Sequence, residues 1–172
     1  MKPSLTNTLC TRCGLCCDGS LFADVELANP DEATGLEVMG LEIEDTDGDA
    51  GGLLLQPCLA LKGKRCGIYP HRPDCCRTFE CRLLQEVKRG TVGVEQAQAK
   101  IAEALLQIKR INRLIVQLGP GNARLPLKER CSEALALSEE FAVAPESKCK
   151  RTELRTAMAA VERLIHETFL SG

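Results

Sequence analysis

The chain has almost no aromatic residues. Among its 172 residues there is no tryptophan, one tyrosine and four phenylalanines, so that aromatic residues make up only 3% of the composition. Hydrophobic residues nevertheless reach 44%, and the core must therefore be filled by leucine, isoleucine, valine and alanine. Such a composition suits helices better than a β-sandwich or a barrel, and it predicts an α+β fold that is mostly α.

The chain also lacks long apolar runs. No stretch approaches the ~20 apolar residues of a membrane-spanning helix, and the first ten residues have neither the apolar region nor the cleavage site of a secretory signal. These absences indicate a cytoplasmic protein without a membrane partner. The net charge of −2 does not point to nucleic acid either. We expect a protein as the redox or regulatory partner.

Cysteine, in contrast, is abundant, with eleven residues in the chain. The number is odd, and neither of the vicinal pairs Cys16-Cys17 and Cys75-Cys76 can close a comfortable disulfide, so thiolate ligands in a reducing compartment are expected. Eight of the cysteines are predicted to bind metal. They are Cys10, Cys13, Cys16, Cys17, Cys58, Cys66, Cys76 and Cys81.

The spacing of the first cysteines favours an iron–sulfur cluster. Bacterial ferredoxins use Cys-x-x-Cys-x-x-Cys to present three thiolates to one 4Fe–4S cube, with a fourth ligand remote in sequence, and Cys10, Cys13 and Cys16 have this spacing. Zinc sites more often combine two separate Cys-x-x-Cys pairs. Zinc is therefore the alternative, and copper(I), which soft thiolates also bind, is a third.

The vicinal pair Cys16-Cys17 bears on the number of centres. Consecutive side chains diverge, so both rarely bind the same small ion, and one of the two is expected to serve a second metal, as the fourth ferredoxin cysteine does. Eight ligands and one diverging pair predict either two four-cysteine centres close together or one larger cluster shared by the whole set.

Charge is distributed unevenly along the cysteine-rich part. No lysine or arginine lies between Cys13 and Leu61, whereas residues 62–89 contain eight basic residues and three acidic ones. Arg72 and Arg77 could neutralise clustered thiolates, although a solvated face explains the basic residues equally well. The acidic stretch 44–52 lacks the glutamate that ends an EF-hand loop, and we interpret it as a solvated loop.

Residues 1–90 are predicted to form a cysteine-rich metal-binding domain. Alternation over 21–27 predicts a short strand, and Asn29-Pro30 begins a helix that ends near Gly40. Residues 53–69 are interpreted as a hairpin that brings Cys58 and Cys66 opposite or diagonal to each other across two strands, within reach of one metal centre. A further helix, with Pro73 in its first turn, is predicted to continue to Val87.

Residues 91–172 are predicted to form a helical extension of about three helices, packing on the first domain. Apolar residues recur at helical spacing over 101–118, before Gly119-Pro120-Gly121, and a shorter helix is predicted over 127–137. A third helix is predicted from Thr152 onward. If the apolar faces of these helices were exposed, the extension would instead form a homodimer, and this alternative stays open.

Several further residues have simpler interpretations. Cys131 and Cys149 are expected to be packing residues. Cys75 is expected to be a small packing residue too, with a spare thiol beside the cluster or a redox-active neighbour as the alternatives. His71 is expected to be a surface histidine, with a ligand or proton donor near Cys66 as the alternative. No nucleophile–base pair, phosphate loop or paired-carboxylate site emerges, so the sequence names no catalytic residue and does not decide whether the protein is an enzyme.

The combined motifs resemble a known family. Cys-x-x-Cys-Gly-Leu-Cys-Cys, then Pro57-Cys58-Leu59, Cys66-Gly67-Ile68-Tyr69, Arg72-Pro73-x-x-Cys76-Arg77 and Phe79-x-Cys81 resemble the cysteine-cluster (CxxCxxCC, YkgJ-type) family of zinc- or iron-chelating domains. The resemblance covers about residues 10–85. One branch of that family resembles the flagellin lysine N-methylases, which carry an iron–sulfur cluster. This chain is much shorter and has no glycine-rich loop for S-adenosylmethionine, so lysine methylation is the more distant implication.

Overall fold

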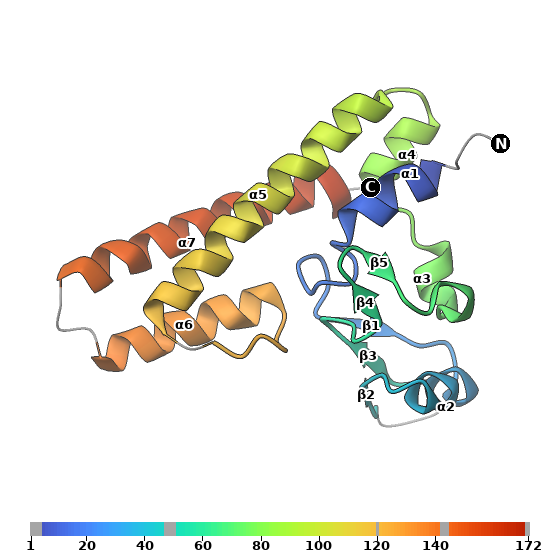
Figure 1. Cartoon of the computed structure of the whole chain (residues 1–172), viewed down its shortest axis with the longest axis horizontal. Helices are drawn as coiled ribbons and strands as arrows, with labels where there is room; N and C mark the ends of the chain where they lie inside the picture. Colours follow the sequence, from blue (N-terminus) through green and yellow to red (C-terminus); the bar gives the residue numbers. More distant parts are fainter. Residues whose placement is uncertain (1–4, 47–50, 120, 142–144, 171–172) are drawn as a thin grey trace. The chain divides into compact units, whose positions relative to one another are not determined.

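A computed structural model describes residues 5–46, 51–119, 121–141 and 145–170. Within these ranges the chain forms seven α helices and five short strands, and it divides into two compact units, Met1–Cys81 and Arg82–Gly172 (Figure 1). The α+β, mainly helical fold predicted from composition is confirmed. Residues 82–90, which we had grouped with the cysteine-rich part, belong to the second unit.

The first unit contains a small antiparallel sheet covered by one helix. Its strand order is β1-β3-β2, with β1 at Asp24–Glu26, β2 at Ile43–Glu44 and β3 at Leu53–Leu55. Helix α2 (Pro30–Val38) begins as predicted, because the Asn29 side chain accepts a hydrogen bond from the Glu32 amide at 2.9 Å. The sheet and α2 enclose a compact apolar cluster. Its buried members are Leu27, Leu36, Leu41, Leu54 and Ala60.

The predicted hairpin over 53–69 exists in a shorter form. Its strands are β4 (Leu61–Lys62) and β5 (Arg65–Cys66), and Leu61 lies opposite Cys66. Cys58 precedes the hairpin in a turn, so the prediction that it lies opposite or diagonal to Cys66 across two strands is wrong. The reason is that Leu53–Leu55 pairs with β1 and β2, two partners distant in sequence, and not with residues 65–69.

The single helix predicted from Pro73 to Val87 is two helices. Pro73 is the N-cap of α3 (Asp74–Thr78), and α4 covers Arg82–Lys88. Phe79 leaves the helical conformation, and its ring packs edge-on against Phe22 with 5.2 Å between the ring centroids. This tertiary contact accompanies the break, which leaves Cys81 in the connection between the two helices.

The second unit is a set of packed helices. Helix α5 (Val94–Leu118), α6 (Leu127–Phe141) and α7 (Pro145–Ile165) pack on one another, with α7 returning alongside α5 (Figure 1). A π-helical turn, η2 (His166–Leu170), follows α7 and contacts α4. The predicted apolar stripes are buried, as shown by Ile108 on α5 and by Leu154 and Val161 on α7. Helix α7 begins at Pro145, earlier than the predicted Thr152. The sequence did not predict its first two turns because they are polar and carry no apolar pattern.

Two further predictions can be compared with the fold. Part of the acidic stretch 44–52, namely residues 47–50, lies outside the described residues. Among the residues that are described, no helix has the length and apolar character needed to cross a membrane.

Candidate metal centre

All of the candidate ligands lie in the first unit, and four of them follow one another around the end of helix α1 (Leu5–Cys13). Cys10 and Cys13 are three residues apart in this helix and therefore share a face. Gly14 has φ +77° and ends the helix, as glycine commonly does at this position. Its carbonyl accepts hydrogen bonds from the amides of both Cys17 (3.0 Å) and Asp18 (3.1 Å).

Gly14 also allows the β4–β5 hairpin to approach closely. A Cβ atom on Gly14 would lie 3.3 Å from Cα of Lys64, which belongs to the turn of the hairpin. Helix α1 correspondingly packs beside β5, the strand that ends in Cys66. The glycine between Cys13 and Cys16 is thus needed for its conformation and for its lack of a side chain.

Backbone hydrogen bonds connect the N-terminal cysteines to the downstream ones. The Cys58 amide donates to the Cys17 carbonyl at 2.8 Å, and the buried side-chain oxygen of Gln56 accepts from the same amide at 3.1 Å. The Cys58 carbonyl in turn accepts from the amide of Leu61, at 2.9 Å, and Leu61 is the partner of Cys66 across the hairpin. Cys17, Cys58 and Cys66 are therefore fixed relative to one another through the main chain.

Helix α3 contributes Cys76, and Glu32 holds the start of this helix. One oxygen of the Glu32 carboxylate accepts from the Asp74 amide at 2.7 Å, and the other accepts from the Ala28 amide at 3.0 Å. Glu32 thus joins the start of α2 to the start of α3. The sequence analysis missed this residue, although its position three residues after the N-cap Asn29 is the one from which a glutamate commonly reaches back to the backbone.

Arg72 lies beside Cys76 and Cys17. Its guanidinium stacks 3.8 Å from the centre of the Tyr69 ring, and it donates to the carbonyls of Tyr69 and Cys76, each at 3.3 Å. Arg77 donates from Nε to the Arg72 carbonyl at 2.6 Å. Arg72 opposes the rise in the pKa of Cys17, so this arginine, as the sequence suggested, is placed where it would reduce the charge of bound thiolates.

Electrostatic interactions group the thiols into two neighbourhoods, which are coupled through Cys16 and Cys17. In the first, burial raises the pKa of Cys13 to about 12, and the charges of Cys81 and Cys10 add to the rise. Burial also raises the pKa of Cys16, where Cys13, Cys17, Cys81 and Cys10 contribute. Cys10 and Cys81 thus affect both Cys13 and Cys16, and Cys16 is also affected by Cys13 and by its sequence neighbour Cys17.

The second neighbourhood has different members. Burial, followed by the charges of Cys58 and Cys66, raises the pKa of Cys17 to about 12. Burial raises the pKa of Cys76, with Cys75, Cys17 and Cys58 contributing, and it raises that of Cys58, with Cys66 contributing. These interactions join Cys17, Cys58, Cys66 and Cys76, and they include Cys75, whose thiol is hydrogen-bonded to that of Cys76.

Three further cysteines, Cys75, Cys131 and Cys149, are not among the candidate ligands. Cys75 packs against the apolar cluster of the first unit, and burial raises the pKa of its thiol. Cys131 is buried in the second unit, as a packing residue should be, whereas Cys149 is exposed on α7, so the prediction that it packs in the core is wrong. His71 is exposed, at the end of a short 3₁₀ turn.

The donor set suits a soft or borderline metal. The candidate ligands are all thiols, which is the chemistry of zinc, copper(I) and iron–sulfur sites, and no disulfide joins any of the eleven cysteines. Within the described ranges, no three His, Cys, Asp or Glu side chains already converge tightly enough to hold one ion. The residues therefore fit a thiolate-bound metal by type and neighbourhood, with side chains that still have to turn toward it.

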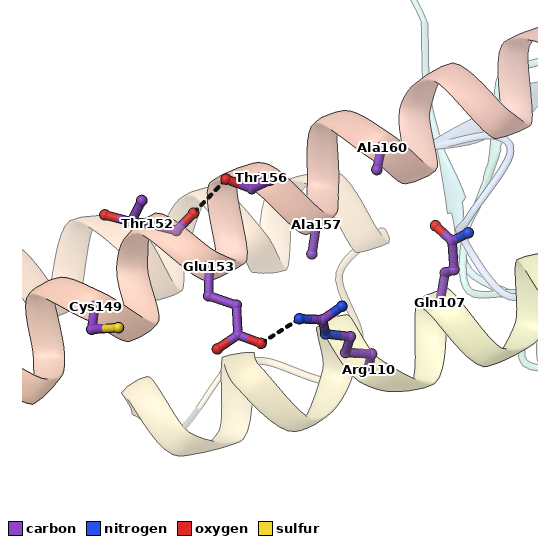
Figure 2. A pocket seen from close by; sticks show the side chains of 8 residues that line it. All are labelled: Gln107, Arg110, Cys149, Thr152, Glu153, Thr156, Ala157 and Ala160. Atoms are coloured by element: carbon purple, nitrogen blue, oxygen red, sulfur yellow. Dashed lines mark hydrogen bonds and ion pairs between the residues drawn. The ribbon is translucent and has the colours of Figure 1, made fainter.

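A groove on the second unit contains none of these ligands. It lies between α5 and α7, and its two charged residues, Arg110 and Glu153, are paired with each other at 2.6 Å (Figure 2). Most of the other lining residues are small or neutral, among them Thr152, Thr156 and Ala157. The groove has no evident chemistry of its own, and the cysteines of the first unit remain the candidate site.

Comparison with known proteins supports this site. The family model named CxxCxxCC, described as "Putative zinc- or iron-chelating domain", matches residues 9–104, which is more than half of the chain and includes all eight candidate ligands. Searches among curated proteins and among solved structures gave no significant match. The chain belongs to the CxxCxxCC family of zinc- or iron-chelating domains.

Proposed function

We propose that this protein is an iron–sulfur protein that acts in electron transfer, redox sensing or a cluster-dependent modification. The observation that carries the proposal is the arrangement around α1. Cys10, Cys13 and Cys16 have the spacing that ferredoxins use for three ligands of a cube, and the remote Cys81 shares their electrostatic neighbourhood. Three close ligands and one distant ligand are one common way in which a chain supplies the four thiolates of a 4Fe–4S cluster.

The surroundings of the thiols fit a redox role. Cys13, Cys16 and Cys17 are half-buried, so that a cluster bound there would be shielded from water without being enclosed. Arg72 supplies positive charge beside Cys17, and the Leu15 amide donates a hydrogen bond to the Cys13 thiol. Nearby charge and hydrogen bonds to sulfur are the means by which proteins adjust cluster potentials. When bound, a cluster would supply one-electron chemistry to a protein partner.

The test is the composition of the protein purified without oxygen. We expect a brown protein with broad visible absorption that contains iron and acid-labile sulfide. A colourless protein with stoichiometric zinc and no sulfide would overturn the proposal. Cys131→Ser is a suitable control, because its side chain is buried in the second unit, away from the candidate ligands, and the variant should retain the metal.

A zinc-binding interaction module is the second candidate, and the small core of the first unit favours it. Strands of two or three residues and an apolar cluster of five buried side chains leave room for a metal to contribute folding energy. This candidate predicts that chelation unfolds the first unit and that no redox couple exists. A reversible one-electron reduction of the purified protein would exclude it.

A further inference from the structure

We propose that an acidic protein docks on the β4–β5 hairpin, beside the candidate ligands of the first unit. The docking surface consists of three exposed basic side chains, Lys62, Lys64 and Arg65, which we call the basic hairpin. This inference rests on the proposed function in taking the partner to be a redox or regulatory protein of the metal centre. It deepens that function by naming the face on which the partner binds and the charge that the partner carries.

Two of the three cations pack on glycines of the cysteine segments. A Cβ atom on Gly67, the residue after Cys66, would lie 3.3 Å from Cε and 3.4 Å from Cδ of Lys62. A Cβ atom on Gly14, in the turn after α1, would lie 3.5 Å from Cβ and 3.7 Å from Cγ of Lys64. The aliphatic parts of both lysines therefore lie on backbone next to candidate ligands, which limits how far the two ammonium groups can move from the site.

The basic hairpin presents its charges on a free face. Lys62 pairs with Arg65 across the two strands, and Leu61 pairs with Cys66. Because successive side chains of a strand point to opposite faces, Lys62 and Arg65 share the face that Cys66 does not use. In the part of the chain that the structure describes, no side chain of the basic hairpin has an ion-pair or hydrogen-bond partner. This face is therefore available to another molecule.

Neutralising the thiolates does not require these exposed cations. Arg72 is half-buried, stacks on Tyr69 and donates to the Cys76 carbonyl at 3.3 Å, so it is the cation that is placed for that task. Exposed ammonium groups are screened by water and salt and stabilise a more buried charge only weakly. The basic hairpin instead supplies a positive potential at the surface, which attracts an anionic partner.

Charge is divided between the two ends of the first unit. Apart from Arg12, in the last turn of α1, every lysine and arginine that the structure describes in this unit lies in residues 62–77. Most of its acidic residues lie in β1, α2 and β2 or next to them, over residues 24–45. Helix α2 and β2 lie at the end of the unit away from α1, whereas the hairpin packs on α1 (Figure 1). A unit polarised in this way turns the acidic face of an approaching partner toward the hairpin.

The surroundings of the basic hairpin favour a protein over a nucleic acid. Leu59, in the turn that leads into β4, is 49% exposed, and an apolar side chain next to a charged rim is typical of small, transient protein interfaces. Three cations are few for a nucleic acid, whose affinity grows with the number of phosphates that are neutralised. The acidic end of the same unit would also repel a long polyanion.

The test measures the binding of a dye-labelled peptide of alternating glutamate and alanine, which presents the carboxylates of an acidic protein surface. Fluorescence anisotropy follows this binding with the protein as purified. We expect the affinity to fall as salt is added, because exposed charges are screened over about 10 Å at 0.1 M ionic strength. The double variant Lys62→Glu, Arg65→Glu should weaken binding roughly tenfold or more, since two attractive contacts become repulsive.

The matched control is the double variant Lys109→Glu, Arg113→Glu. Both residues are exposed on α5 in the second unit, and the variant changes the net charge by the same amount, but it should bind the peptide almost as tightly as the unmodified protein. Circular dichroism checks that each variant is folded. If the glutamate pair on the hairpin does not fold, Lys62→Gln, Arg65→Gln, which removes the charges without repulsion, should weaken binding by a smaller factor and decides the comparison.

Three outcomes would overturn the proposal. They are the absence of binding, equal weakening by the two charge-reversal variants, and tighter binding of a single-stranded DNA that carries the same charge as the peptide. Peptide binding does not depend on which metal the protein contains. A colourless zinc protein that binds the peptide through the basic hairpin would therefore refute the iron–sulfur proposal and leave the docking surface intact.

Discussion

The role of Gly14 leads to a prediction that separates backbone strain from the approach of the hairpin. Gly14→Ala forces a residue with a side chain to keep φ +77°, which costs roughly 1–2 kcal/mol. It also places a Cβ atom 3.3 Å from the Cα atom of Lys64, a distance at which the hairpin must shift by a few tenths of an ångström. Since Cys66 lies on this hairpin, we expect the shift to reduce metal content as well as stability.

Gly40→Ala is the matched control. Gly40 has φ +83° and no atom within 4 Å of the position that its Cβ would occupy, so the variant carries the same strain without the contact. We expect Gly40→Ala to lose roughly 1–2 kcal/mol of unfolding free energy and to retain its full metal content. Gly14→Ala should lose more stability and a measurable share of the metal.

The assay combines urea unfolding, followed by the fluorescence of Tyr69, with metal analysis of anaerobically purified protein. The unfolding midpoints of both variants are compared with that of the unmodified chain. Equal midpoints and equal metal contents for Gly14→Ala and Gly40→Ala would show that the approach of the hairpin to Gly14 plays no part in forming the site.

Two further predictions concern packing and pH. Leu154→Ala should lower the unfolding free energy of the second unit by about 2–5 kcal/mol, because Leu154 is fully buried. Leu106 is 69% exposed, so Leu106→Ala should change this free energy by no more than about 0.5 kcal/mol. Equal effects of the two variants in urea unfolding followed by circular dichroism would contradict the packing described. In metal-free protein, burial raises the pKa of Cys13 and Cys17 from the ordinary 9.0 to about 12. The protonated thiols therefore stabilise the folded state below pH 9. This stability is lost as the pH rises from 9 to 12, at up to about 1.4 kcal/mol per pH unit for each thiol. Urea midpoints between pH 8 and 11 measure the slope. A Cys13→Ser, Cys17→Ser double variant should reduce it, and the part that remains comes from Cys16, Cys58 and Cys76, whose pKa values burial also raises.

Local signals predicted the parts of the fold that local interactions determine. Asn29 and Pro30 predicted the start of α2 because the cap is formed within three residues, and the glycines around position 120 predicted the end of α5. Leu53–Leu55 was misassigned because its two partner strands, β1 and β2, come from distant residues. The break at Phe79 was missed for a related reason, since the ring that it packs against, Phe22, is more than fifty residues away.

The candidate site could be predicted as a set of residues but not as an arrangement. The Cys-x-x-Cys-x-x-Cys-Cys spacing predicted four of the eight candidate ligands, and the divergence of Cys16 and Cys17 predicted that more than one metal is bound. The connection of Cys58 and Cys66 to Cys17 depends on tertiary hydrogen bonds, and the interaction of Cys81 with Cys13 depends on how the segment after α3 folds back. No spacing rule contains this information.

The hydrogen bonds of Glu32 have a consequence for how the apoprotein receives metal. Because both carboxylate oxygens are bonded to backbone amides, one in each of two segments, α3 is attached to the α2 end of the first unit by contacts that involve no thiol. Cys76 is therefore preorganised: part of the conformational entropy that metal capture would otherwise have to overcome is already lost when the chain folds. Metal acquisition at this position is then closer to filling a partly assembled receptor than to driving the folding of a disordered chain.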